Sequence, residues 1–276
     1  MEDMNFSPLT KPLIFDSHAH YDDERLLGCG DELFTELSKS VAGILTCSCD
    51  FVSCETAKSL AEKYEFVYFA AGIHPENVGS IEGLSLDAVK QKLTEFSQHK
   101  KCVAIGEIGL DYYWTQDNIP LQRETFSAQL ELGNALSMPV IIHDRDAHAD
   151  TLEMLKRYKP KGVVHSYSGS AEMAKEIYKL GLYIGISGVI TFKNAKKLPD
   201  VVKEMPLDRF LLETDAPYLA PVPFRGKTNN SSLIYYSAEK IGEIKGISTE
   251  DVLKYAMENT QRLYSLGSLS IVGVKS

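Results

Sequence analysis

The stretch LIFDSHAHYDD, residues 13–23, places two histidines two positions apart at the end of an apolar run. In a β-strand, residues i and i+2 project from the same face, so His18 and His20 would point in the same direction. Two imidazoles that converge in this way can bind a metal ion. The same spacing also fits a polar strand end with two incidental histidines, and the choice depends on what the rest of the chain places beside them.

Apolar, β-branched runs recur along the chain and predict strands. Between most of them lie stretches with apolar residues at three- and four-residue spacing, which predict helices; residues 121–136 and 170–181 are the clearest. The second of these begins with Ser170, a good N-cap, and ends with Gly181. The predicted strands are 12–15, 41–47, 66–73, 102–108, 139–143, 162–166, 182–187 and 209–213.

This alternation of strands and helices indicates βαβ units and a parallel sheet. Eight such units predict an α/β fold, a (β/α)8 TIM barrel, with residues 1–276 as a single domain. The alternative is an open doubly wound sheet, but no GxGxxG motif follows the first strand.

Most of the predicted strands end in ionisable side chains, and only those at 41–47 and 182–187 do not. In a (β/α)8 barrel the carboxyl ends of the strands form the active-site face. Burying so many polar groups without partners would cost on the order of several kcal/mol, and a metal site would offset that cost. The candidate ligands are His18, His20, Glu107, His143, His165 and Asp215.

Six ligands are more than the roughly three protein ligands that one catalytic zinc ion needs. They can hold two divalent ions if one carboxylate bridges, and Glu107, on the fourth predicted strand, is the expected bridge. Two ions about 3.5–4 Å apart can contact both the attacking and the leaving oxygen of a phosphoryl displacement. Zn, Mn or Ni suit these ligands, and Mg suits them less well. We assign the first ion to His18, His20 and Asp215, and the second to His143 and His165.

The net charge of −9 is unusual for a nucleic-acid binder, which normally carries a basic surface. If the substrate is a polyanion, bound divalent cations would supply the missing positive charge. The first 15 residues do not form a signal-peptide pattern, and no apolar run approaches the ~20 residues that cross a bilayer. We therefore expect a cytoplasmic protein with no membrane contact and no obligate protein partner.

Five cysteines at uneven spacing do not indicate a disulfide framework. Three of them crowd into TCSCDFVSC, residues 46–54, where a zinc site is conceivable. Because no second Cys/His pair has structural-zinc spacing, reduced and partly buried thiols at a strand end are the favoured interpretation.

Three stretches, IFDSHAHYD, PVIIHDRDAHAD and FLLETDAP, resemble the signature sequences of the TatD family of metal-dependent deoxyribonucleases. GIHPE, GEIGLDYYW, HSYSGS, APYLAPVPFRGKTNN and ENTQRLY extend the resemblance over about residues 13–264. The resemblance implies an amidohydrolase-like TIM barrel with a two-metal centre, acting on DNA as a 3′–5′ exonuclease or an endonuclease. The family's ligands fall on the six positions given above.

The departures from the family pattern touch none of these ligands. Phe210 takes a place that is usually aliphatic, HSYSGS replaces the commoner HCFSGS, and Ser231 stands where proline often follows the asparagines.

Asp215 and Glu107 are the predicted catalytic residues. Asp215 would act as the general base or orient the attacking water, and the alternative is that it only supports a ligand. Asp16 and Glu213 lie two residues before predicted ligands and could orient the histidines. Structural hydrogen bonds inside the barrel are the alternative for both.

Five further residues are predicted to contact substrate, each with a structural alternative. His74 would donate to a phosphate, or else cap the chain that follows it. Arg145 would bind a phosphate, or form a salt bridge to Asp111 or Asp146. Arg225 and Lys227, on the long loop from 215 to 231, would bind phosphodiesters, or be solvated surface charges. Tyr112, with its neighbours Tyr113 and Trp114, would stack on bases, or pack at the rim.

These observations predict a metal-dependent deoxyribonuclease. The main alternative is a hydrolase of the same superfold that acts on a small lactone, amide or phosphoester. Some such barrels bridge their metals with a carboxylated lysine on the fourth strand, and Glu107 at that place favours the nuclease. A non-catalytic binding protein is disfavoured by the complete ligand set.

Overall fold

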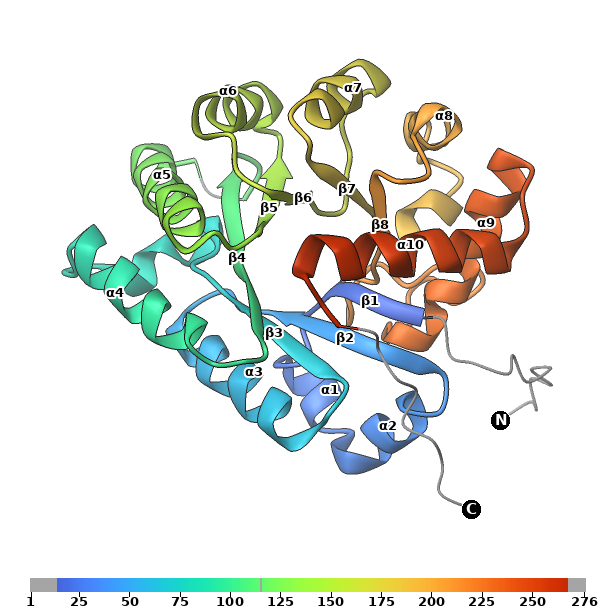
Figure 1. The fold of residues 1–276 in the computed structure, drawn as a ribbon, viewed down its shortest axis with the longest axis horizontal. Helices are drawn as coiled ribbons and strands as arrows, with labels where there is room; N and C mark the ends of the chain where they lie inside the picture. Colours follow the sequence, from blue (N-terminus) through green and yellow to red (C-terminus); the bar gives the residue numbers. More distant parts are fainter. Residues whose placement is uncertain (1–13, 115, 268–276) are drawn as a thin grey trace.

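The eight strands form one parallel sheet in sequence order, and the helices surround it (Figure 1). A computed structural model describes residues 14–114 and 116–267. An isolated bridge between Ala19 and Ala216 joins the first strand to the chain that follows the last, so the sheet is nearly closed. The predicted (β/α)8 barrel is confirmed and the doubly wound alternative is wrong, while the predicted boundaries at 1 and 276 lie outside the described residues. The strands are β1 Ile14–Ala19, β2 Val41–Cys47, β3 Val67–Ala71, β4 Cys102–Asp111, β5 Val140–Arg145, β6 Gly162–Val164, β7 Tyr183–Ile186 and β8 Phe210–Leu212.

The two clearest predicted helices are both present. One is α5, which begins slightly before its predicted start because Pro120 stands in its first turn, where its missing N–H needs no partner. In the other, α7, the Ser170 side chain accepts from the backbone N–H of Met173, and Gly181 adopts the left-handed conformation, with φ 81°, just after the helix end. The α-helices are α1 Glu24–Leu27, α2 Gly30–Leu37, α3 Phe51–Lys63, α4 Leu86–Ser97, α5 Ile119–Leu136, α6 His148–Tyr158, α7 Ala171–Lys179, α8 Leu198–Glu204, α9 Ile234–Lys245 and α10 Thr249–Tyr264; the 3-10 helices are η1 Pro75–Ile81, η2 Gly188–Thr191 and η3 Ser231–Leu233.

Three strands continue beyond the apolar runs that predicted them, and one of these, β5, continues to Arg145. β1 continues to Ala19 and includes His18, and β4 continues to Asp111. The extensions of β1 and β4 carry polar side chains that are buried inside the barrel. The end of an apolar run therefore marks the end of the apolar core, and the strand itself continues. Its further residues form the polar layer that holds the candidate site.

Along the barrel axis, the interior consists of an apolar layer and a polar layer. Its apolar layer takes a side chain from each strand, and Leu263 and Tyr264 at the end of α10 pack against that layer. Side chains such as Phe69 and Phe126 belong to the larger apolar cluster between strands and helices. This arrangement leaves the carboxyl ends of the strands for polar groups. The strand residues of the interior layer are Phe15, Leu45, Cys47, Ala70, Ala104, Ile141, Val163, Tyr183 and Leu211.

A buried glutamine of α5 fixes the chain that leads into His74. The Ile73 N–H donates to Oε1 of Gln129 at 2.8 Å, and Nε2 of Gln129 donates to the Ile73 carbonyl at 3.0 Å. Gln129 is fully buried, so neither main-chain group of Ile73 has water as a ready substitute. The side chain thus pairs with the backbone as a neighbouring strand would.

Replacing this glutamine should destabilise the protein far more than replacing an exposed one. Gln129→Ala leaves two buried main-chain groups without partners, so the free energy of unfolding should fall by about 2–4 kcal/mol. Gln91→Ala, on the exposed side of α4, should change it by less than about 0.5 kcal/mol. Urea denaturation of the two variants measures both values, and similar losses would contradict this account of Gln129.

Candidate metal centre

All six predicted ligands meet inside the carboxyl end of the barrel, together with His74. They come from or directly follow β1, β3, β4, β5, β6 and β8. The side chains of His18 and Glu107 are almost completely buried, at 0% and 2% exposure, and that of Asp215 is 17% exposed. The group therefore sits at the floor of the mouth, with limited access to solvent on one side.

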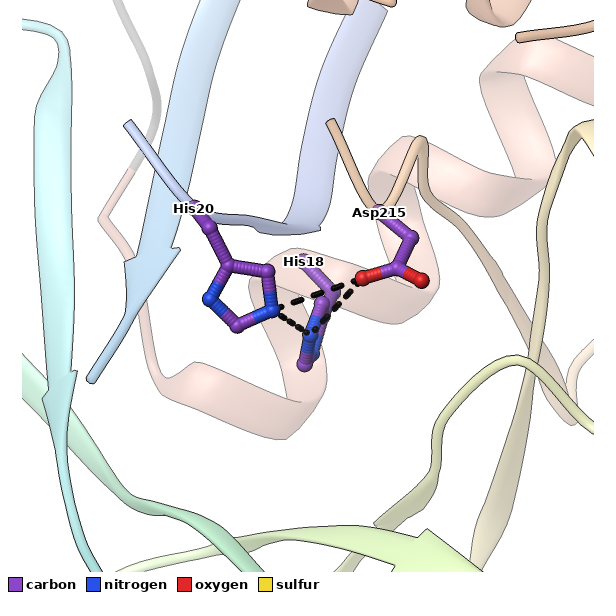
Figure 2. Close-up of side chains that lie close together, drawn as sticks. All are labelled: His18, His20 and Asp215. Atoms are coloured by element: carbon purple, nitrogen blue, oxygen red, sulfur yellow. Dashed lines mark hydrogen bonds and ion pairs between the residues drawn. The ribbon is translucent and has the colours of Figure 1, made fainter. Parts of the chain in front are cut away.

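The first group consists of His18, His20 and Asp215 (Figure 2). The two Nε2 atoms are 3.2 Å apart, and Oδ1 of Asp215 lies 3.6 Å from that of His18 and 3.4 Å from that of His20. Two ligand atoms on one tetrahedral zinc ion, each at 2.0–2.1 Å, would be about 3.3 Å apart. The spacing therefore suits a single cation between these atoms.

The second group consists of His143 and His165, with one oxygen of Glu107. Nδ1 of His143 and Nε2 of His165 are 3.2 Å apart, the same separation as in the first group. Oε1 of Glu107 lies 2.8 Å from the former and 2.7 Å from the latter. The two nitrogens thus have the spacing of ligands to one cation, and the oxygen lies within hydrogen-bond distance of both.

Glu107 contributes one oxygen to each side. Its Oε2 lies 3.2 Å from Nε2 of His18 and 3.5 Å from Nε2 of His20, while Oε1 faces His143 and His165. This is the arrangement expected of a carboxylate that bridges two ions.

Two of the histidines have their ring protons fixed by acceptors behind them. Nδ1 of His20 lies 3.0 Å from the carbonyl oxygen of Cys47, which can only accept, so Nδ1 carries the proton. Nε2 of His143 lies 2.9 Å from Oδ2 of Asp111, which favours the proton on Nε2. The opposite nitrogen of each ring faces the centre, where it donates to the carboxylates when it is protonated and offers the lone pair that a metal ligand requires when the ring is neutral.

The other two histidines are held by weaker contacts and by each other. Nδ1 of His18 lies 3.3 Å from the Cys47 sulfur, and Nδ1 of His165 lies 3.7 Å from a Glu213 oxygen. The rings of His18 and His165 stack with centroids 3.9 Å apart and planes 10° apart. Imidazole nitrogens and carboxylate oxygens converge at this point, and such a donor set fits divalent cations.

The carboxylates remain charged despite their burial. Burial opposes ionisation of Glu107, but the neighbouring histidines, His165 foremost, hold its pKa well below the usual range. Burial likewise opposes ionisation of Asp215, while the hydrogen bond from His20 and the nearby His18 lower its pKa. Both groups can therefore act as anionic ligands at neutral pH.

Asp215 adopts a backbone conformation that is rare for aspartate. Its φ of 58° lies in the left-handed region, which costs about 1–3 kcal/mol for a residue other than glycine. Main-chain bonds hold it there: its N–H donates to the His18 carbonyl at 2.9 Å, and the His20 N–H donates to the Ala216 carbonyl at 2.6 Å. The strained turn aims the Asp215 carboxylate at the two histidines of β1 and its end.

His74 lies beside the ligands but is set up as a donor. Its Nδ1 accepts from the Glu76 N–H at 3.2 Å, which is also the capping bond that begins η1. Burial lowers the pKa of His74 to about 4, so the ring is neutral near pH 7 and its proton is on Nε2. Nε2 lies 3.4 Å from Oε1 of Glu107. Both predicted roles, capping and donation into the site, are thus compatible in one side chain.

The predicted cationic contacts lie over aromatic rings. The Arg145 guanidinium is 4.5 Å from the Tyr113 ring centre and 5.4 Å from that of Trp114. Arg225 lies 4.3 Å from the ring centre of Phe192, and Lys227 is exposed on the same loop. Arg145 is the last residue of β5, and Arg225 and Lys227 lie in the loop that follows β8. All three cations are therefore at the carboxyl-terminal side of the barrel.

Tyr112 is held by contacts with other parts of the protein. Its hydroxyl donates to Asp150 at 2.7 Å, and its ring packs against the outer apolar cluster, which is the rim-packing alternative. Its neighbours Tyr113 and Trp114 are 52% and 60% exposed. Tyr113 and Trp114 lie in the turn that follows β4, and stacking on bases stays a prediction for these exposed rings.

Asp111 contacts a predicted ligand, a role that the sequence does not predict, since the sequence offers it only as a partner of Arg145. It lies on the same strand as Glu107, four positions later, and its carboxylate holds His143. The even spacing from Glu107 along β4 was the signal that could have identified it.

Glu213 and Asp16, the two residues predicted to orient histidines, make different contacts. Glu213 faces the ring of His165 and accepts from the Ser166 N–H, so it supports a predicted ligand. Asp16 accepts from the main-chain N–H of His18 at 3.3 Å and from Thr214 and Ser231, which is the structural alternative.

The three cysteines of residues 46–54 are free thiols, and Cys47 and Cys49 lie beside the histidines. Cys47 and Cys54 are buried, and the Cys49 sulfur lies 3.9 Å from Nδ1 of His20. Reduced, partly buried thiols were the favoured prediction. Cys49 also forms a group of possible metal ligands with His20 and Glu107, residues that already belong to the centre.

Comparisons with known proteins match nearly the whole chain. Residues 15–265 match the family described as TatD related DNase. The chain is 39% identical to "Uncharacterized metal-dependent hydrolase YabD" of Bacillus subtilis, over 92% of this chain and 100% of that protein. It is 34% identical to "Uncharacterized metal-dependent hydrolase YcfH" of Escherichia coli K12, over 95% and 99%. The crystal structure of YjjV, a TatD homologue from Escherichia coli, superposes with a TM-score of 0.85 at 30% identity, covering 93% of this chain and 99% of that one.

None of the helices in residues 14–114 and 116–267 has the length and apolarity needed to cross a membrane.

The bridge can be tested by metal content. If Glu107 serves both ions, Glu107→Ala should lower the occupancy of both, whereas His165→Ala should mainly empty one. Elemental analysis of protein equilibrated with limiting metal counts the ions retained by each variant. His148→Ala provides a control, because that histidine pairs with Asp144 instead of the centre. The same single loss in both variants would refute the bridge.

Proposed function

The chain belongs to the family of TatD-related DNases, and from that premise we propose that it is a metal-dependent deoxyribonuclease, acting as a 3′–5′ exonuclease with two metal ions. The membership agrees with the resemblance seen in the sequence motifs. The relatives are named metal-dependent hydrolases, and this chain is an enzyme of that kind. The substrate, the direction of cleavage and the number of ions are our proposals.

The shared carboxylate of Glu107 is the observation that carries the two-metal proposal. Its oxygens lie 3.2 Å and 2.7 Å from histidine nitrogens of the two different groups. When bound, a pair of divalent cations would polarise the phosphate and stabilise negative charge on the attacking and leaving oxygens. The residues that would hold them are the six predicted ligands, and the donor set suits Zn, Mn or Ni, with Mg less well matched.

Asp215 is the proposed general base or water-orienting residue. Its side chain is more exposed than that of Glu107, the other carboxylate at the centre, at 17% against 2%. It can therefore contact a water molecule that enters from solvent. Its lowered pKa keeps the carboxylate ionised at neutral pH, which is the form that a base or a water-orienting acceptor requires. Its strained, firmly hydrogen-bonded backbone holds the carboxylate in a constant direction.

The proposed phosphate contacts lie around the mouth. Neutral His74 offers an Nε2–H donor at the centre, and Arg145, Arg225 and Lys227 supply positive charge on surrounding segments. Exposed Tyr113 and Trp114 present ring faces on which bases can stack. These groups explain how an acidic chain can bind a polyanion locally.

We keep the cytoplasm as a proposed location, because the cysteines at 29, 47, 49, 54 and 102 are free thiols, as expected in a reducing compartment. A single catalytic domain over residues 1–276, and the absence of an obligate protein partner, are likewise proposals.

Metal dependence is the first test of the proposal. EDTA should abolish cleavage of end-labelled single- and double-stranded DNA, and added Zn, Mn or Mg should restore it. Shortening by single nucleotides from the 3′ end would support the exonuclease assignment. A panel of lactones, amides and small phosphoesters tests the other hydrolase function. Full activity on DNA after complete removal of metal would overturn the metal mechanism, and turnover of the panel without DNA cleavage would overturn the nuclease.

Asp215→Asn separates a base from a simple ligand. The amide keeps the size but loses the charge that orients and deprotonates water, so single-turnover cleavage should fall by about 10²–10⁴-fold. Substrate affinity should change little, because the proposed phosphate contacts are elsewhere. The rate is measured with a labelled oligonucleotide across a metal titration. If Asp215 is only a ligand, excess metal should rescue most of the rate, and that result would rule out the base.

A further inference from the structure

A buried polar network lies directly behind the first ligand group. The Asp16 carboxylate accepts hydrogen bonds from the Thr214 hydroxyl at 2.5 Å, from the Ser231 hydroxyl at 2.6 Å and from the main-chain N–H groups of Thr214 and His18 at 3.0 and 3.3 Å. Tyr21 joins the network through its hydroxyl, 2.7 Å from Oγ of Ser231. The side chains of Asp16 and Tyr21 and the whole of Ser231 are inaccessible to solvent.

When the Asp16 carboxylate is ionised, the chemistry of the groups sets the direction of each bond. With four donors around it, the Asp16 carboxylate acts as acceptor, so the Ser231 hydroxyl donates to it. The Ser231 oxygen can then accept from the Tyr21 hydroxyl, and the Tyr21 oxygen accepts from the Ser231 N–H at 3.0 Å. Ser231 therefore uses both its N–H and its hydroxyl in one closed arrangement. A residue without a side-chain hydroxyl would break this arrangement, and proline would also lack the N–H.

This network holds one end of the loop that follows β8. The loop leaves the barrel at Asp215, where main-chain bonds to β1 secure it. Within the loop, the Asn229 side chain donates to the carbonyls of Thr214 and Tyr218 at 3.0 and 2.7 Å, which ties the two arms together. The returning arm meets β1 and Tyr21 through Ser231, the first residue of η3. Arg225 and Lys227 are exposed between these attachments.

We propose that Ser231 is a positioning residue for substrate binding: its hydroxyl fastens the loop carrying Arg225 and Lys227 to the strand that carries His18. The hydroxyl itself is buried and reaches no substrate, so it acts only through the loop. Asp16 is the anchor on the strand side, and it links the same loop to the backbone of His18 and of Thr214, the neighbour of Asp215. The assignment rests on the proposed function only in the identity of the ligand that the loop holds.

Two variants remove the link from opposite sides. Ser231→Ala removes the hydroxyl, and Tyr21→Phe removes the hydroxyl that donates to it. Because both leave the six predicted ligands intact, metal content measured by elemental analysis should stay at the wild-type level. In each variant KM for a labelled oligonucleotide should rise about 5–10-fold while kcat changes less than about 2-fold, as expected for the loss of binding contacts made equally in ground and transition states.

Ser232→Ala is the matched control. Ser232 is the next residue of η3, and its hydroxyl bonds to Oδ1 of Asn230 at 2.6 Å, within the same turn. The control removes the same chemical group one position away without touching Asp16 or Tyr21, so its KM should equal that of the wild type.

Amide hydrogen exchange of the substrate-free protein supplies a readout that does not depend on the nuclease activity. In Ser231→Ala and Tyr21→Phe, residues 216–230 should exchange faster than in Ser232→Ala, while β1 to β4 exchange as in the wild type. Faster exchange without any DNA cleavage by the wild type would overturn the proposed function and keep the fastening role. A lower melting temperature with unchanged KM and unchanged loop exchange would show a merely structural serine and overturn the inference.

Discussion

The candidate site depends on one buried carboxylate that has to serve two sides. Glu107 is nearly inaccessible to water, and a charge in that position is tolerated only if cations or donors surround it. Five histidines meet that requirement: His18 and His20 lie at Oε2, and His74, His143 and His165 lie at Oε1. Because these residues are far apart in sequence, only a nearly closed barrel brings them together. The fold and the charge of Glu107 therefore constrain each other.

The sequence was sufficient to predict the fold and which residues gather at the centre, and the reason is periodicity. Each strand is buried on both faces, so it appears as an apolar run, and the ligands were recognised as polar residues that interrupt this pattern at a consistent end. Contacts across the barrel carry no such signal. Three features depend on neighbours in space, and periodicity along one chain does not identify them. They are the pairing of Asp111 with His143, the donor state of His74, and the hydrogen bond from Tyr112 to Asp150.

The apolar layer that stabilises the barrel is separate from the polar layer that holds the candidate site. Apolar side chains near the amino ends of the strands fill the interior and are sealed by the end of α10, whereas the carboxyl ends hold charged groups and a strained aspartate. Strain at Asp215 persists because main-chain bonds to β1 over-determine its position. Those bonds also close the sheet between its first and last strands, so the contact that completes the barrel is the contact that aims Asp215.

The same seam explains how an acidic protein can handle a polyanion. With a net charge of −9, the surface as a whole repels DNA, and attraction has to come from a small region where cations are concentrated. The loop after β8 starts at a predicted metal ligand and carries two of the cationic side chains, so metal binding and phosphate binding are connected through one segment. Fixing that segment to β1 at both ends would keep its positive charge at a constant distance from the proposed ions. The hydrogen bonds behind the candidate metal centre would then make the loop part of the wall of the site.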